Sequence, residues 1–267
     1  MKRTFKLSTG VFGEGDPKIF APIVGRTKED VFKAAEVIAK TEADVVEWRG
    51  DWFDRVEDRD ELLEVLQGIR GRIREKALLF TLRTVYEGGQ LAVMKDTYYE
   101  LNERAARSGY VDLVDVEAFR EEERTSEEIR KLQSAGVHVI ASFHNFDRTP
   151  DREELIRRLT RMQEMGADVA KIAVMPQSRE DVMTLMEATM EADHSLDIPV
   201  VTMSMGRLGV LSRLAGTLTG SAMTFASVGE ASAPGQIPIE QSILSAFVYE
   251  IEKQAAPFDT VRGLLFL

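Results

Sequence analysis

The chain has 267 residues, 44% hydrophobic and 30% charged, a composition typical of one globular α/β-barrel domain or of two small domains. Its net charge of −11 argues against a nucleic-acid partner, which would need a clustered positive face. The absence of cysteine excludes disulfides, thiolate metal sites and cysteine nucleophiles, and it fits a cytoplasmic protein. Because the sequence contains neither an apolar signal segment after Met1 nor an apolar run of 18 residues, we expect a protein that is neither secreted nor membrane-spanning.

The first residues predict a small element that precedes the main fold. Gly10, Gly13 and Gly15 separate short β-prone pieces within residues 1–16, which indicates an N-terminal β-hairpin. After it come segments rich in Val, Ile, Leu and Phe, most of them apolar in their first half and polar at their carboxyl end. They predict strands at residues 18–25, 43–53, 77–84, 110–119, 137–146, 167–176, 199–206 and 221–228.

Helical patterns lie between these strands. The clearest start is Thr27-x-x-Asp30, a capping box, and others follow Pro150 and open at Ser178. The predicted helices span residues 27–40, 57–71, 90–108, 125–135, 151–165, 178–192, 208–218 and 239–254. About eight strands alternating with about eight helices predict a (β/α)8 TIM barrel that forms a single domain over residues 1–267. A doubly wound open sheet is the alternative, but no Gly-x-Gly-x-x-Gly follows the first strand.

A barrel brings the carboxyl ends of its strands to one face, where side chains two residues apart point the same way. Such polar or functional residues occur on most of the predicted strands. They are Glu47 and Arg49, Thr81 and Arg83, Asp115 and Glu117, Ser142 and His144, Lys171, Met203 and Met205, and Phe225. We therefore expect a site at this end of the barrel.

Lys171 lies in the middle of the strand predicted at residues 167–176, which is apolar almost throughout. A buried ammonium is costly unless it is paired or discharged, and a neutral lysine is a nucleophile toward carbonyl carbon. The position therefore favours a Schiff-base lysine. The alternative is a lysine whose stem crosses the core while its head reaches water.

His144 is the histidine that a strand delivers to the predicted site. His138 begins the same strand and is expected to be structural, whereas His194 is expected in a surface loop. Since imidazole titrates near pH 6.5, His144 is suited to move protons. Glu87 follows the third strand in a glycine-flanked loop, where it could orient and stabilise that imidazole or could remain a solvated carboxylate.

Arg49, Arg83 and Arg213 are candidates for binding a carboxylate and hydroxyls, because guanidinium offers a planar fork of donors. The last strand is followed by a long loop of small residues, 229–238, which contains Ser232 and Gln236. We interpret this loop as a mobile lid over the site, with a plain connection as the alternative.

Six ordered blocks resemble one enzyme family. They are Glu47-Trp48-Arg49, Thr81-Leu82-Arg83 with Glu87-Gly88-Gly89, Ser142-Phe143-His144, Val169-Ala170-Lys171, Met203 to Arg213, and Ser232-Ala233-Pro234-Gly235-Gln236. From residue 18 to the carboxyl terminus the chain is similar to the type I 3-dehydroquinate dehydratases of the shikimate pathway. Two positions depart from the family pattern: Pro22 stands where several members have serine, and Asn145 where aspartate is frequent.

The resemblance implies a role for each candidate. Lys171 would form an imine with the ketone of the small-molecule substrate 3-dehydroquinate, and His144, supported by Glu87, would move protons. The residues implied in binding its hydroxyls and carboxylate are Glu47, Arg49, Arg83, Arg213, Ser232 and Gln236. It also implies a cytoplasmic homodimer of aromatic amino acid biosynthesis that uses no metal or other cofactor.

Two other functions remain as alternatives. A class I aldolase would share the lysine but would cleave a carbon–carbon bond, and a ligand sensor derived from the barrel would have lost its catalytic groups. The sequence retains both Lys171 and His144, which argues against the sensor, whereas an aldolase would normally bind a phosphorylated or acyclic substrate.

Overall fold

The computed structural model describes residues 2–229 and 232–240, in which a parallel sheet curls into a barrel. The strands of this sheet are β3 (Lys18–Ile23), β4 (Val45–Arg49), β5 (Ala77–Thr81), β6 (Leu113–Glu117), β7 (His138–Asn145), β8 (Val169–Val174), β9 (Val200–Ser204), β10 (Met223–Ser227) and β11 (Ile237–Pro238). Neighbouring strands from β3 to β9 pair in chain order, and β10 pairs with both β3 and β11. A parallel bridge between Val200 and Ser221 joins the two edges, so the predicted (β/α)8 barrel is confirmed.

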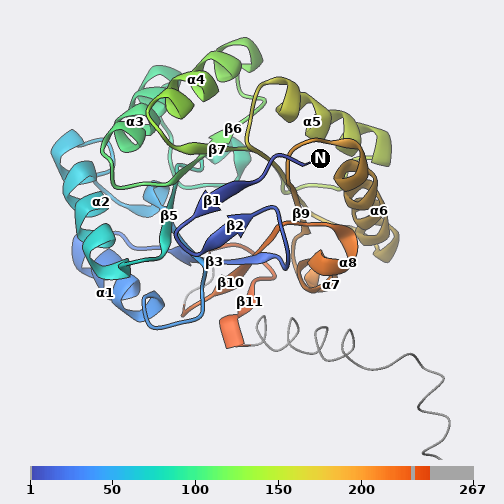
Figure 1. Ribbon diagram of the computed structural model, residues 1–267, viewed down its shortest axis with the longest axis horizontal. Coiled ribbons are helices and arrows are strands. Elements are labelled where there is room, and N and C mark those ends of the chain that lie inside the picture. Colours follow the sequence, from blue (N-terminus) through green and yellow to red (C-terminus); the bar gives the residue numbers. More distant parts are fainter. Residues whose placement is uncertain (1, 230–231, 241–267) are drawn as a thin grey trace, which may run out of the picture.

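Helices surround the strands as an outer ring (Figure 1). They are α1 (Lys28–Ile38), α2 (Arg59–Ile73), α3 (Lys95–Arg107), α4 (Glu122–Ser134), α5 (Arg152–Glu164), α6 (Arg179–Ser195), α7 (Val210–Leu214) and α8 (Gly216–Thr219), with single 3-10 turns at η1 (Gly50–Trp52) and η2 (Val85–Glu87). The capping box at Thr27 is present, since its side chain accepts from the backbone of Asp30 while the Asp30 carboxylate accepts from the backbone N–H of Thr27. Asp151 and Ser178 cap α5 and α6 with their side-chain oxygens, which accept from the backbone N–H groups of Glu154 and Asp181.

Several predicted boundaries were wrong. Helix α4 begins at Glu122, before the expected residue 125, and the segment 208–218 is broken into α7 and α8. The predicted strand at residues 43–53 ends at Arg49 and continues as the turn η1. His194 is exposed as expected, but it lies in the last turn of α6 and not in a loop. Most of the helix predicted at residues 239–254 falls outside the described residues.

Alternate side chains of each strand enter two different apolar cores. On β5, Leu79 points into the barrel, while Leu78 and Phe80 pack outward beneath the helices. On β8, Val169 and Ala173 face inward. Burial on both faces explains why these strands are almost continuously apolar. Lys171 has the inward parity of Val169 and Ala173, which places its side chain inside the barrel.

The predicted hairpin is confirmed as β1 (Phe5–Leu7) and β2 (Gly10–Phe12), which pair antiparallel. It lies across the amino-terminal end of the barrel (Figure 1). Phe12 is fully buried in the inner core, and Phe5 stacks on His138 with 3.9 Å between ring centroids. His138 thus has the structural role expected of it, and the functional candidates occupy the opposite end. Nowhere in the described ranges is a helix long and apolar enough to cross a membrane.

Candidate active site

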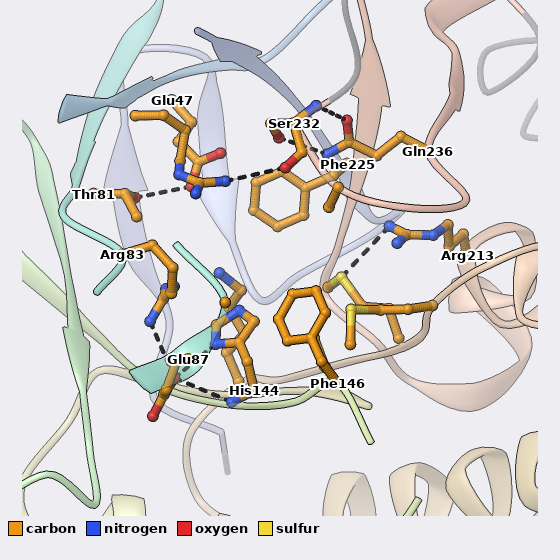
Figure 2. Close-up of a pocket in the computed structure, with 17 residues that line it drawn as sticks. Glu47, Thr81, Arg83, Glu87, His144, Phe146, Arg213, Phe225, Ser232 and Gln236 are labelled. Carbon is orange, nitrogen blue, oxygen red and sulfur yellow. Dashed lines mark hydrogen bonds and ion pairs between the residues drawn. The ribbon is translucent and has the colours of Figure 1, made fainter. Parts of the chain in front are cut away.

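A cavity opens at the carboxyl ends of the strands. All nine candidate residues line it, as Figure 2 shows for most of them. They are Glu47, Arg49, Arg83, Glu87, His144, Lys171, Arg213, Ser232 and Gln236. The remaining wall is largely apolar and includes Phe146, Ala173, Met203, Met205 and Phe225. This lining suits a small polar molecule with an apolar ring face.

Lys171 is 3% exposed and forms an ion pair with Asp115, with 3.0 Å between Nζ and Oδ2. Burial by itself would raise the pKa of Asp115, but Arg83 and Lys171 outweigh it and lower that pKa to about 2. A buried lysine must either pair with an anion or lose its charge, and in this structure Lys171 is paired with Asp115. Nζ also lies 4.9 Å from the centre of the Phe225 ring, at the floor of the cavity.

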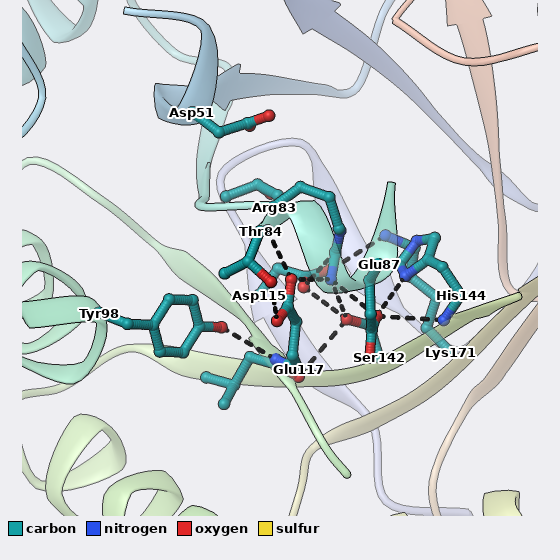
Figure 3. Close-up of polar contacts among 12 residues, drawn as sticks. Asp51, Arg83, Thr84, Glu87, Tyr98, Asp115, Glu117, Ser142, His144 and Lys171 are labelled. Atoms are coloured by element: carbon teal, nitrogen blue, oxygen red, sulfur yellow. Dashed lines mark hydrogen bonds and ion pairs between the residues drawn. The ribbon is translucent and has the colours of Figure 1, made fainter. Parts of the chain in front are cut away.

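His144 lies beside Lys171 because β7 and β8 are paired, with Ser142 opposite Lys171 (Figure 3). Its Nδ1 is 2.8 Å from Oε2 of Glu87, and its backbone N–H donates to the same oxygen. Burial lowers the pKa of His144 well below its usual value, and the positive charges of Arg83, Lys171 and Arg49 lower it further. A neutral imidazole that donates Nδ1–H to Glu87 keeps Nε2 as a base.

Glu87 is buried beside the cavity, in the turn η2. Burial raises the pKa of Glu87 well above its usual value, and Arg83 opposes this shift from 3.2 Å. The predicted contact between Glu87 and His144 is present, and a solvated carboxylate is excluded because only 9% of the residue is exposed.

Arg83 is the centre of a buried network of charges (Figure 3). Its guanidinium donates to Asp115 at 2.6 Å, to Ser142 at 3.0 Å and to Glu117 at 3.4 Å. These carboxylates raise the pKa of Arg83 above its usual value despite burial. Most N–H groups of Arg83 are therefore already bound to protein groups, and few remain free to bind a ligand in the cavity.

Arg49 and Glu47 are held by partners on the same rim. The Nε and Nη2 groups of Arg49 donate to the two carboxylate oxygens of Asp51, each at 2.8 Å, which is the bidentate geometry of a strong ion pair. Glu47 accepts a hydrogen bond of 2.8 Å from the Thr81 hydroxyl. Both side chains are therefore fixed before any ligand enters.

Arg213, on α7, has no carboxylate partner within the described ranges. It donates only to the sulfur of Met203 and to the Pro234 carbonyl, and its buried Nε has no partner there. Burial lowers the pKa of this guanidinium to about 10. A buried cation without an anion, at the wall of a cavity, is suited to bind an anionic ligand.

Ser232 and Gln236 face the cavity from the loop after β10. The Gln236 amide accepts from the backbone of Ser232 at 2.9 Å and donates to its hydroxyl at 3.0 Å. Arg49 donates to the carbonyl of Ser232 and Arg213 to that of Pro234. The loop is thus attached to the arginines of the site, and it ends in β11, which the sequence did not predict.

The two departures from the family pattern do not line the cavity. Pro22 is buried on β3, and the Asn145 side chain accepts from the backbone N–H groups of Asp147 and Arg148. Asn145 therefore shapes the turn after β7.

Asp51, Asp115 and Glu117 belong to the site, but the sequence argument assigned them no role. The sequence did indicate that Asp115 and Glu117 face the site, because both lie at the carboxyl end of a predicted strand and point into the barrel. There was no such indication for Asp51, since it lies beyond its strand, in η1. No three His, Asp or Glu side chains of residues 2–229 and 232–240 are grouped so that they could hold a metal ion.

Comparison with known proteins gives a consistent result. The family model of type I 3-dehydroquinase matches residues 19–249. The 3-dehydroquinate dehydratase of Syntrophotalea carbinolica is 49% identical over 235 residues, covering 88% of this chain and 93% of the relative. That of Listeria welshimeri is 48% identical over 230 residues, covering 86% and 91%.

Solved structures agree with these relatives. The type I 3-dehydroquinate dehydratase of Clostridium difficile, solved with covalently modified comenic acid, superposes with a TM-score of 0.91 at 43% identity. The match covers 94% of this chain and all of that one (100%). The 3-dehydroquinate dehydratase of Geobacillus kaustophilus gives the same TM-score, 0.91, at 39% identity over 93% of this chain and 97% of its own.

Proposed function

This chain belongs to the type I 3-dehydroquinase family, whose members are hydro-lyases, and we propose that it dehydrates 3-dehydroquinate through a Schiff base on Lys171. One observation carries the mechanism. A buried amine and a neutral imidazole lie on paired strands and face the same small cavity. An amine can activate a ketone as its imine, and an imidazole can then remove the adjacent proton.

The reaction begins when Lys171, the cation of the pair with Asp115, gives a proton to the neutral His144 and the free amine attacks the C3 carbonyl. His144 returns that proton to the carbinolamine hydroxyl, which leaves as water and gives a protonated imine. Asp115, whose pKa is about 2, remains a carboxylate 3.0 Å from Nζ and stabilises this positive charge. The imine acts as an electron sink, so His144 can take the C2 proton through Nε2 and form an enamine. Glu87 fixes the other ring nitrogen.

The enamine then expels the C1 hydroxyl, which leaves as water with the proton that His144 holds. Addition of water to the conjugated imine frees 3-dehydroshikimate and restores Lys171. General acid–base catalysis of this kind supplies a factor of about 10² to 10⁴. The rest must come from covalent activation and from positioning, for which the rigid strand ends are suited.

The substrate carboxylate is assigned to Arg213, because that guanidinium has no protein carboxylate in the described ranges. We assign the ring hydroxyls to Glu47, Arg49, Ser232 and Gln236, whose polar atoms line the same cavity. Arg83 also lines it, but its contacts with protein carboxylates lead us to expect a smaller share of binding than that of Arg213.

The biological setting follows the relatives named above. We place the enzyme in the shikimate pathway of aromatic amino acid biosynthesis, in the cytoplasm, as a homodimer of single-domain subunits that uses no cofactor. The support is the name 3-dehydroquinate dehydratase carried by relatives that share 48–49% identity.

The Schiff-base assignment is tested by Lys171→Ala. We expect turnover to be lost while the fold remains, because Asp115 keeps its second cation, Arg83. The measurement is the rate of 3-dehydroshikimate formation, with thermal unfolding as the check on folding. Lys131→Ala, which removes a lysine 42% exposed on α4, is the control and should retain the wild-type rate. Wild-type turnover by Lys171→Ala would contradict the proposal.

A further inference from the structure

Glu117 is a fully buried carboxylate that does not line the catalytic cavity. Both of its oxygens bind Thr84: one accepts the backbone N–H at 2.7 Å and the other the hydroxyl at 2.8 Å. Its own backbone N–H donates to the hydroxyl of Tyr98 at 3.0 Å, and Arg83 lies 3.4 Å away (Figure 3). Burying a carboxylate is costly, so a carboxylate that touches no ligand needs another reason to be there.

Thr84 is the residue from which the turn η2 starts. Its carbonyl accepts the backbone N–H of Glu87 at 3.0 Å and that of Gly89 at 2.8 Å. A threonine in this position often caps the turn with its own hydroxyl, but here the hydroxyl is bound to Glu117 and makes no cap. Two consecutive sets of hydrogen bonds thus connect Glu117 to the backbone of Glu87.

The rest of the turn is held mainly by backbone hydrogen bonds within its own loop, such as that from the Val85 N–H to the Leu91 carbonyl at 3.0 Å. Its other two residues, Val85 and Tyr86, are 49% and 78% exposed, so apolar burial contributes little. At the far end of the loop, Asp51 accepts the backbone N–H of Gln90 at 3.1 Å. A segment with few buried apolar contacts depends on its hydrogen bonds for local order.

We propose that Glu117 is a positioning residue, which holds Glu87 against Nδ1 of His144 by fixing Thr84. The inference rests on the proposed function, in which the Glu87–His144 pair moves the protons. Glu117 lies outside the lining of the cavity and reaches the site through two contacts, with Thr84 and with Arg83. The contact with Thr84 is the one that leads to the backbone of Glu87. Loss of this support lets η2 shift, and the 2.8 Å contact that orients the imidazole is then made less often.

The test is a pair of double-mutant cycles. Thr84→Val removes the hydroxyl without changing charge and so isolates the route through the turn. Glu117→Gln removes the charge with little change in shape, but it also weakens the contact with Arg83. We expect each to lower kcat by about 5- to 30-fold, the range for loss of a buried hydrogen bond, with KM changed less than about twofold. In a Glu87→Gln background each should lower kcat by less than about twofold, because Glu87 is then no longer the group being positioned.

Two further variants serve as controls. Thr84→Ser keeps the hydroxyl and should restore most of the lost rate. Thr125→Val removes another buried threonine hydroxyl, one bound to Tyr99 and distant from the cavity, and should leave kcat unchanged. Thermal unfolding of all variants shows whether a loss of rate follows a loss of fold.

The outcomes separate this inference from the proposed function. Equal losses of kcat in the wild-type and Glu87→Gln backgrounds, or no loss in either, would overturn the positioning role of Glu117. If Lys171→Ala retains activity, the covalent function fails whatever the cycles give. If Lys171→Ala is inactive, and if the variants lower kcat in the wild-type but not in the Glu87→Gln background, the covalent function and the positioning role of Glu117 are both supported.

Discussion

The charged side chains of the site determine the protonation of each catalytic group. His144 is surrounded by Arg83, Lys171 and Arg49, and burial together with these cations lowers its pKa well below the usual value. The nearby carboxylates are already engaged: Asp115 with Lys171, and Glu87 with the imidazole itself. The free enzyme therefore presents His144 as a base at neutral pH.

This environment predicts the pH dependence of the reaction. A base must be neutral to act, so activity should be lost as pH falls through the depressed pKa of His144. We expect the acidic limb of kcat/KM to lie clearly below the ordinary histidine pKa of about 6.5. Nitrogen NMR of the three histidines should likewise show His144 neutral at pH 6.5, with His138 and His194 observed in the same sample. An imidazolium signal for His144 at that pH would contradict the account.

The sequence could identify the catalytic residues more easily than their partners. Lys171 stands out because it is a charge in an apolar strand, and the period of two along a strand places His144 toward the same site. Its ion pair with Asp115 could not be predicted, because it reaches from β8 across β7 to β6 and depends on the curvature of the barrel. Asp51 and the direction of Arg213 depend on the turn η1 and the short helix α7, which have no periodic signal.

At the scale of elements, the loop after β10 forms part of the cavity wall. Gly235 has a φ of +80°, and a Cβ there would lie 2.5 Å from the carbonyl oxygen of Gly206. Only glycine permits this close approach, which brings Ser232 and Gln236 to the cavity. The sequence indicated the loop by its length and small residues but did not indicate the strand β11 within it.

Gly235→Ala should therefore impair catalysis through the loop. We expect kcat/KM to fall by at least about tenfold, because the displaced loop withdraws two binding groups worth about 1.4 kcal/mol or more together. Gly229→Ala is the matched control: its φ is +83°, but among residues 2–229 and 232–240 no atom lies within 4 Å of the added Cβ. Both variants carry similar backbone strain, so an equal loss of kcat/KM in the two would show that the contact with Gly206 is unimportant.

At the scale of the whole molecule, stability and function occupy opposite ends of the barrel. The hairpin covers the amino-terminal end with Phe12 in the inner core, and the charged site lies at the carboxyl-terminal end. The alternation of elements was sufficient to predict this architecture. The sequence could not show that β1 and β2 cover the end of the barrel, since their contacts with the barrel join residues far apart in the chain.

Phe12→Ala should lower stability and leave the chemistry intact. Removal of a fully buried phenylalanine costs about 3–5 kcal/mol, which should appear as a lower midpoint of urea unfolding. Below that midpoint, kcat should remain within about twofold of wild type, because the catalytic groups belong to the other end of the barrel. A loss of kcat in the folded variant would mean that the two ends are coupled.

The covalent role of Lys171 is the central claim, and reductive trapping tests it most directly. Sodium borohydride added to the enzyme during turnover of 3-dehydroquinate reduces an imine to a stable amine, which peptide mass spectrometry can locate. We predict one adduct, on the peptide that carries Lys171, and none in Lys171→Ala. Dehydration that proceeds at the normal rate without an adduct on Lys171 would contradict the mechanism and leave this lysine as a structural partner of Asp115.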